Sequence, residues 1–268
     1  MFDRRDWLFL AVAACWLLLA TVPWISSLGV EHDEAHFFPW AAKIAFGSPE
    51  RLRPPDGLYV AHRPIPFMTM PYVGGLDAWL YAAAFQVGGV NRVAPRVVNL
   101  ALAVAFLVLT YGLGKRLGSR AVAIGTVALL LVDLEFLLHV PTGFGPFLIQ
   151  ILCGSGMAWL LAREDAGPRQ LLGASLLAGI ALNEKLTFVW FGGALVLALL
   201  VCYGGQVRRH GWWLPLAAVV VAVIATPTIW YAWGRPEIVF GFGRSNARLP
   251  ADWNTILAKF EQWQLLMD

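Results

Sequence analysis

The chain has 268 residues, of which 59% are apolar and only 14% charged, and its formal net charge is +3. A soluble domain typically carries about 25% charged residues, so these proportions exclude the water-soluble globular classes and predict an integral membrane protein. Thirteen Trp and sixteen Phe supply aromatic side chains of the kind that gather at bilayer interfaces. The small net charge gives no support for a nucleic-acid partner.

Long apolar stretches predict membrane-spanning helices, because about 20 mostly apolar residues are needed to cross a bilayer. Clusters of Lys and Arg, which favour the cytoplasmic side, precede the first stretch and follow the second, fourth and sixth. We therefore expect an all-α polytopic protein of the plasma (inner) membrane, with a cytoplasmic N-terminus. About seven spans are expected, at residues 7–29, 96–115, 120–139, 144–162, 169–185, 186–205 and 212–233.

Residues 30–95 form a large extracytoplasmic loop in this topology. The apolar segment 64–90 within the loop is too short to cross the bilayer twice, and Pro and Gly interrupt it. We expect it to form a re-entrant or interfacial helix. The transmembrane domain then covers residues 1–233, and residues 234–268 begin a further extracytoplasmic loop.

Five titratable residues crowd the outer end of the first expected span: Glu31, His32, Asp33, Glu34 and His36. One interpretation is a solvated loop that ends the helix. A second is a metal site, because the two histidines are four residues apart and would share a helix face, with Glu31 or Glu34 as third ligand. A third is a general base, Asp33 or Glu34, that faces a cavity at the bilayer surface.

Two further polar pairs fall on the same side of the membrane in this topology. His62 and Arg63 precede Pro64, and Glu184 and Lys185 interrupt two apolar segments. Taken alone, Arg63 could be an interfacial anchor, and Glu184 and Lys185 could neutralise each other. Together they place two cations near the carboxylate cluster, an arrangement that suits an anionic phosphate and a hydroxyl group to be deprotonated.

The order of these motifs resembles that of the GT-C class of membrane glycosyltransferases, in particular the protein O-mannosyltransferases and the aminoarabinose lipid A transferases. The resemblance extends over nearly the whole chain, through motifs that are individually loose. It is carried by Asp33-Glu34, by Arg63-Pro64 ahead of Tyr72 and Trp79, by Val-Asn-Arg-Val-Ala-Pro-Arg-Val-Val-Asn at 90–99, by Gly-Lys-Arg-Leu-Gly at 114–118, and by Gly-Ile-Ala-Leu-Asn-Glu-Lys at 179–185.

The resemblance implies a polyprenyl-phosphate sugar donor and transfer to an acceptor protein, lipid or glycan on the extracytoplasmic face. It assigns Asp33, with Glu34 beside it, to the acceptor, and Lys185 and Arg63 to the donor phosphate, Arg63 standing where the aminoarabinose transferases have Lys. One base and a direct displacement predict inversion at the anomeric carbon. Candidate accessory residues are His32, His36, Glu184 and His62.

Members of this class are usually longer than 268 residues. We therefore expect a fragment, an inactive relative, or one half of a split enzyme whose second subunit supplies the C-terminal helices. No cofactor is identified, and a divalent cation stays open. The alternative functions are a non-catalytic transporter half or assembly scaffold and, further from the observed motifs, a membrane metalloprotease.

Overall fold

The computed structural model describes residues 2–70, 72–143, 147–162 and 166–236. The helices are α1 (Arg4–Thr21), α2 (His32–Phe46), α3 (Leu76–Gly88), α4 (Val93–Leu117), α5 (Arg120–Val132), α6 (Leu134–His139), α7 (Phe147–Leu161), α8 (Pro168–Glu184), α9 (Phe188–His210), α10 (Leu214–Ile224) and α11 (Thr226–Gly234), with 3₁₀ turns η1 (Val22–Trp24) and η2 (Gly211–Trp213). Two antiparallel hairpins pair β1 (Gly57–Val60) with β2 (Arg63–Pro66) and β3 (Met68–Met70) with β4 (Val73–Gly74).

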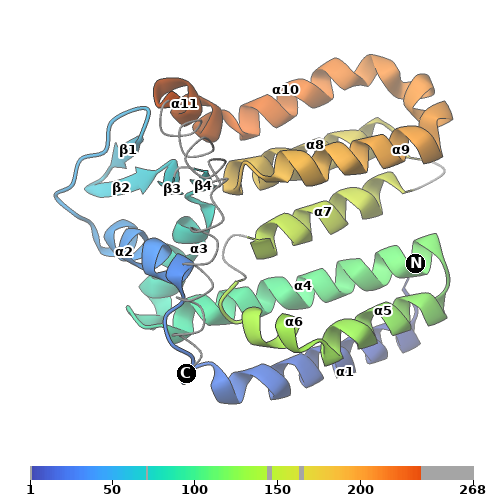
Figure 1. The fold of residues 1–268 in the computed structure, drawn as a ribbon, viewed down its shortest axis with the longest axis horizontal. Coiled ribbons are helices and arrows are strands. Elements are labelled where there is room, and N and C mark those ends of the chain that lie inside the picture. Colours follow the sequence, from blue (N-terminus) through green and yellow to red (C-terminus); the bar gives the residue numbers. More distant parts are fainter. Residues whose placement is uncertain (1, 71, 144–146, 163–165, 237–268) are drawn as a thin grey trace, which may run out of the picture.

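The long helices lie roughly along one direction, and the two ends of the bundle differ (Figure 1). Helix α4 contacts α5 and α7, and α8 contacts α7 and α10. The N-terminus and the α4–α5 and α9–α10 connections lie at one end, whereas α2, α3 and the strands lie at the other (Figure 1). The basic sequence clusters at these two connections therefore share the end that holds the N-terminus.

The lengths of the apolar helices bear on the number of spans. Arg4–Trp24 and Val93–Leu117 are each long and apolar enough to cross a bilayer, with mean hydropathies of 1.9 and 2.1. A third candidate, Gly211–Ile224 with Thr226–Gly234, bends by 67° at its break. Helices α5 and α7 are apolar but shorter. The described residues thus support two or three full-length spans, and the expected count of seven is not confirmed.

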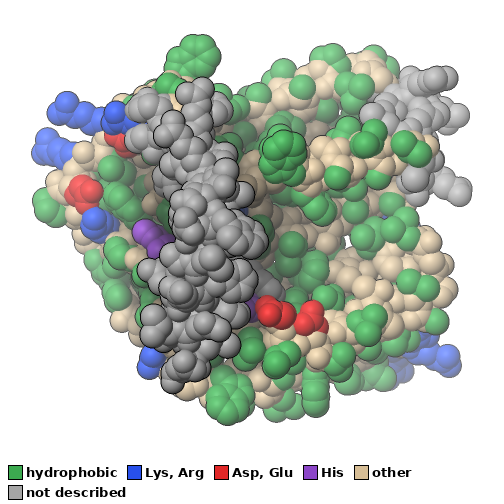
Figure 2. All heavy atoms as spheres, in the orientation of Figure 1, with side chains coloured by type: hydrophobic (Ala, Val, Ile, Leu, Met, Phe, Trp, Pro, Cys, Tyr) green, Lys and Arg blue, Asp and Glu red, His purple; other side chains and the backbone are tan. Residues whose placement is uncertain are grey.

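The surface agrees with a membrane protein. Hydrophobic side chains cover much of the visible helix surface, and the visible Lys and Arg side chains lie toward the two ends (Figure 2). Large apolar side chains face outward, among them Trp190, which is 80% exposed. Soluble monomers rarely expose apolar surface on this scale, because the free energy of hydrating it is unfavourable.

Two expected helices are interrupted. The expected span 120–139 breaks at Asp133, whose carboxylate accepts a hydrogen bond from the Glu135 backbone N–H at 3.0 Å and so caps α6. The expectation of one helix over 64–90 is wrong in its first half, which forms strands β2, β3 and β4. Pro64 and Pro66 supply no backbone N–H for a helix. The second half is helical, as α3.

The start of α2 is fixed by the fully buried side chain of Arg96, on α4. Its guanidinium donates to both carboxylate oxygens of Glu34, at 2.9 and 2.7 Å. It also donates to the carbonyl oxygens of Ile25, Leu28 and Gly29, at 2.8, 3.1 and 2.6 Å. These five contacts use all five N–H groups of the guanidinium. One side chain thus joins α4 to α2 and to the segment after α1.

Close backbone packing joins the second hairpin to the end of α8. A Cβ atom on Gly74 would lie 1.8 Å from the Asn183 carbonyl oxygen, so only Gly permits this approach. Beside this contact, Val73 and Lys185 form an isolated β-bridge, and the Leu186 N–H donates to the Tyr72 carbonyl oxygen at 3.1 Å. The contact places the last residues of α8 directly against the hairpin segment.

Replacing Gly74 with Ala should destabilise the fold by about 1–3 kcal/mol, because the added methyl group must displace the backbone at Asn183. The measurement is the thermal unfolding midpoint of the purified protein in detergent. Gly125→Ala in α5 is the matched control, since no atom lies within 4 Å of its added Cβ. Equal midpoints for the two variants would contradict the proposed role of this contact.

Glu34→Gln should reduce the free energy of unfolding by about 3–5 kcal/mol, because it leaves the buried Arg96 charge without its counter-ion. Denaturant unfolding of the purified chain measures the change. Glu50→Gln is the control, since Glu50 forms an exposed ion pair with Lys43, and its loss should change stability by less than about 1 kcal/mol. A Glu34→Gln protein as stable as the wild type would show that this ion pair does not hold the fold.

Candidate functional site

Asp33 and Glu34, the two carboxylates expected to be catalytic, have different environments at the start of α2. Glu34 is only 1% exposed, and both of its oxygens are bound by Arg96. Asp33 is half-buried and forms no hydrogen bond within the described part of the chain. Its negative charge interacts with Asp77 and with Lys185. Asp33 is therefore the carboxylate of this pair that can receive a hydroxyl proton.

The two histidines of α2 face each other at the surface. The ring centroids of His32 and His36 are 4.9 Å apart, edge to face, and both residues are exposed. Glu34, one of the third ligands considered for a metal, is occupied by Arg96. Across the described residues there is no group of three or more His, Cys, Asp or Glu side chains placed to hold a metal ion. The metalloprotease alternative thus gains no support.

Lys185 follows the last residue of α8 and is only 6% exposed. Its ammonium lies 3.7 Å from the ring centroid of Phe147 and 5.5 Å from that of Tyr72, where the negative faces of the rings attract a cation. It forms no ion pair with any carboxylate in the described chain, including the adjacent Glu184. Its positive charge therefore remains available to an anion.

A second buried carboxylate, Asp77 in the first turn of α3, faces Glu184. Asp77 is 2% exposed and Glu184 is 0% exposed. Oδ2 of Asp77 and both oxygens of Glu184 are buried and have no well-aligned hydrogen-bond donor in the described structure, although the backbone N–H groups of Leu76 and Asp77 lie near the Glu184 carboxyl. The two side chains can hydrogen-bond each other once one of them carries a proton. Burial raises the pKa of Asp77 to about 7, the hydrogen bond with Glu184 opposes this shift, and the charge of Asp33 adds to it.

His62 and Arg63 lie at the turn of the first hairpin. Ala61 and His62 have φ angles of +48° and +64° and form a two-residue connection of the primed type. The Ser48 N–H donates to the His62 carbonyl oxygen at 3.0 Å, which fastens the turn to the end of α2. Both side chains at the turn are exposed, and no hydrogen bond or ion pair joins the Arg63 side chain to another described residue. The structure does not bring Arg63 into contact with Lys185 or Asp33.

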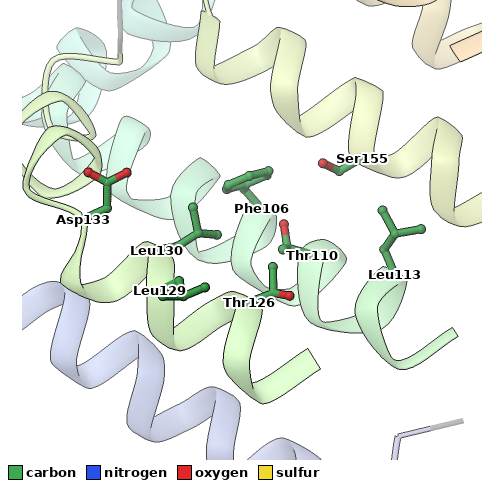
Figure 3. A pocket seen from close by; sticks show the side chains of 8 residues that line it. All are labelled: Phe106, Thr110, Leu113, Thr126, Leu129, Leu130, Asp133 and Ser155. Atoms are coloured by element: carbon green, nitrogen blue, oxygen red, sulfur yellow. The ribbon is translucent and has the colours of Figure 1, made fainter. Parts of the chain in front are cut away.

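A groove of about 410 Å³ runs between α4, α5 and α7. Figure 3 shows Thr110, Thr126 and Ser155 along it, with Phe106 in the middle and Asp133 at one end. Leu113, Leu129 and Leu130 complete the lining. The groove has one carboxylate and no cation in its lining, so it lacks the charge that would bind a phosphate.

Two residues of the site went unassigned in the sequence. Asp77 falls within segment 64–90 and Arg96 within the motif at 90–99, and the sequence analysis predicts no separate role for either. Each is a charged residue at the edge of an apolar helix, where charge is costly unless paired or functional. That signal identifies the residues but not their partners, which lie far away in the sequence.

The comparisons with known proteins concern the family and the fold. A family model described as dolichyl-phosphate-mannose-protein mannosyltransferase matches residues 75–230, more than half of the chain. Among solved structures, the crystal structure of ArnT from Cupriavidus metallidurans bound to undecaprenyl phosphate is similar, with a TM-score of 0.58 and 19% identity. The match covers 88% of this chain and 43% of that one, so the chain spans less than half the length of this relative.

Among curated proteins, no sequence matches the chain significantly. At 19% identity the structural likeness shows the fold alone. The family match is independent of it, because it rests on the sequence of α3 through most of α11. The resemblance to protein O-mannosyltransferases and aminoarabinose transferases is confirmed, and the chain belongs to the dolichyl-phosphate-mannose-protein mannosyltransferase family.

Proposed function

We propose that this chain forms the donor-binding and catalytic part of a glycosyltransferase that uses a polyprenyl-phosphate sugar. The observation that carries the proposal is the buried Lys185 ammonium, which has no ion-pair partner in the described structure and interacts with Asp33. Family membership supports the reaction class, and the similar ArnT structure holds undecaprenyl phosphate. The site lies outside the carboxylate-lined groove between α4, α5 and α7.

Lys185 is the proposed counter-ion of the donor phosphate. Negative charge grows on the phosphate as the glycosidic bond breaks, and a preorganised cation in a buried site stabilises that charge strongly. The rings of Phe147 and Tyr72 hold the ammonium without neutralising it. Arg63, exposed at the start of β2 on a hairpin that contacts α2, is the second proposed cation.

Asp33 is the proposed general base. It accepts the proton of the acceptor hydroxyl as the oxygen attacks the anomeric carbon, and the polyprenyl phosphate leaves with the bonding electron pair. A single displacement inverts the anomeric configuration. Glu34, held by Arg96, fixes the start of α2 and so positions the neighbouring Asp33. His32, His36, His62 and Glu184 surround or adjoin these residues as accessory groups.

We further infer that this site faces the extracytoplasmic side of the inner membrane, with the N-terminus in the cytoplasm. The supporting observation is that α2, α3 and the hairpins lie at the end of the bundle opposite the N-terminus (Figure 1). The acceptor is a protein, lipid or glycan with a free hydroxyl group. A second subunit with further helices is part of this proposal.

Asp33→Asn should lower the transfer rate by about 10²–10⁴-fold, because the base is lost while the shape of the site is retained. The assay follows radiolabelled sugar passing from polyprenyl-phosphate sugars, beginning with mannose, to acceptors in membranes that contain the full chain. Donor affinity should stay near that of the wild type. Unchanged transfer by the Asp33→Asn protein would remove Asp33 from the mechanism.

Lys185→Gln should weaken binding of the donor at least about tenfold, because the buried counter-ion of the phosphate is removed. The measurement is the Kd of a polyprenyl-phosphate sugar for the purified chain, and Arg63→Gln should show a smaller loss. Arg53→Gln is the matched control, because Arg53 is exposed, carries the same charge and lies in the same outer loop as Arg63. Equal affinities for the Lys185→Gln and Arg53→Gln proteins would favour a non-catalytic transporter half or scaffold.

A further inference from the structure

We propose that Asp77 and Glu184 share one proton beside the site of the donor phosphate. While the pair holds this proton, the Lys185 ammonium can bind the phosphate anion. When the proton is lost, the added negative charge of the pair opposes that binding. The inference rests on the proposed function, and it gives roles to two carboxyl groups that the transfer chemistry leaves unused. Both side chains are almost completely buried, and three of their oxygens lack a well-aligned hydrogen-bond donor in the described structure.

The geometry disfavours two full negative charges. A buried carboxylate is stable when it is ion-paired or accepts several hydrogen bonds, and neither carboxyl group of this pair forms an ion pair. Placing one proton between the two carboxyl groups converts two facing acceptors into a donor and an acceptor, which satisfies both at once. The burial that raises the pKa of Asp77 to about 7 agrees with this.

The groups around the pair determine how its proton affects phosphate binding. The groups that interact with the pair are Asp33 from α2, Tyr81 from α3, Cys153 from α7, and Lys185. With one proton shared, the pair carries a single negative charge, which leaves the Lys185 ammonium able to attract a phosphate. Loss of that proton adds a second negative charge and repels a phosphate.

The fold holds the pair in place from both sides. Glu184 ends α8, and the adjacent Asn183 carbonyl is in contact with Gly74, two residues before the start of α3. The Asn183 side-chain oxygen also accepts a hydrogen bond from Thr228 of α11, at 2.8 Å. These contacts hold the backbone at Glu184 close to the start of α3 and so keep the two carboxyl groups near each other.

The test measures how pH changes the affinity of the purified full chain for a polyprenyl methyl phosphate diester, whose single negative charge does not titrate near neutral pH. Wild-type affinity should fall about tenfold between pH 6 and pH 9, because the pair loses its shared proton and gains a charge. Asp77→Asn and Glu184→Gln should each give an affinity that is flat over this range. Glu50→Gln, which removes an exposed carboxylate of the outer segment, should keep the wild-type slope.

Infrared spectroscopy of the wild-type chain provides a second readout that needs no ligand. A C=O stretching band of a protonated carboxyl group should be present at pH 7, and Glu184→Gln should shift or remove it. Absence of that band, or a pH slope that survives in both variants, would overturn the shared proton. Donor binding that depends on Lys185 but not on pH would overturn this inference and leave the proposed function standing. Absence of diester binding by the wild type at any pH would contradict both.

Discussion

The buried guanidinium of Arg96 is the interaction on which the placement of the site depends. A buried positive charge stabilises a fold when its counter-ion and hydrogen-bond acceptors are complete, and here five contacts use all five N–H groups. Three of those contacts bind backbone carbonyl groups after α1, and two bind Glu34 on α2. The chain must therefore turn sharply after α1 and begin α2 against α4, which sets Asp33 beside α3 and Lys185.

The opposite end of the bundle is fastened in the same way by a buried carboxylate. Asp6 of α1 accepts a hydrogen bond from Tyr111 and is ion-paired with Lys115, both on α4, each at 2.5 Å. One cation and one anion thus fix α1 against α4 at its two ends, and apolar packing fills the space between. These buried charges have partners within the protein, whereas the buried charges of the proposed site form no ion pair in the described structure. Among them, Glu184 interacts with Asp77 and Lys185, and Asp33 also interacts with Asp77 and Lys185.

The composition and the apolar stretches were enough to predict a helical membrane protein and the order of its long helices. Asp33 and Lys185 could be singled out because charge at the edge of an apolar helix is costly. Their neighbours could not be predicted, because Glu34 and Arg96 are 62 positions apart and no local pattern pairs them. The strands between Gly57 and Gly74 were missed, since a short hairpin rich in Pro and Gly resembles a loop. The expected span count is not confirmed, because apolar length in the sequence does not fix helix length: Asp133 divides one such stretch.

Photo-crosslinking can show whether the donor phosphate binds beside Lys185 and Asp33. A polyprenyl phosphate with a photoreactive group next to the phosphate would be activated on the full chain, and the labelled peptides identified by mass spectrometry. If the phosphate binds there, the label should appear on peptides that contain Tyr72, Phe147 or Lys185, and excess unlabelled lipid should remove it. Competed labels confined to the groove around Thr110 and Ser155 would contradict this placement of the phosphate.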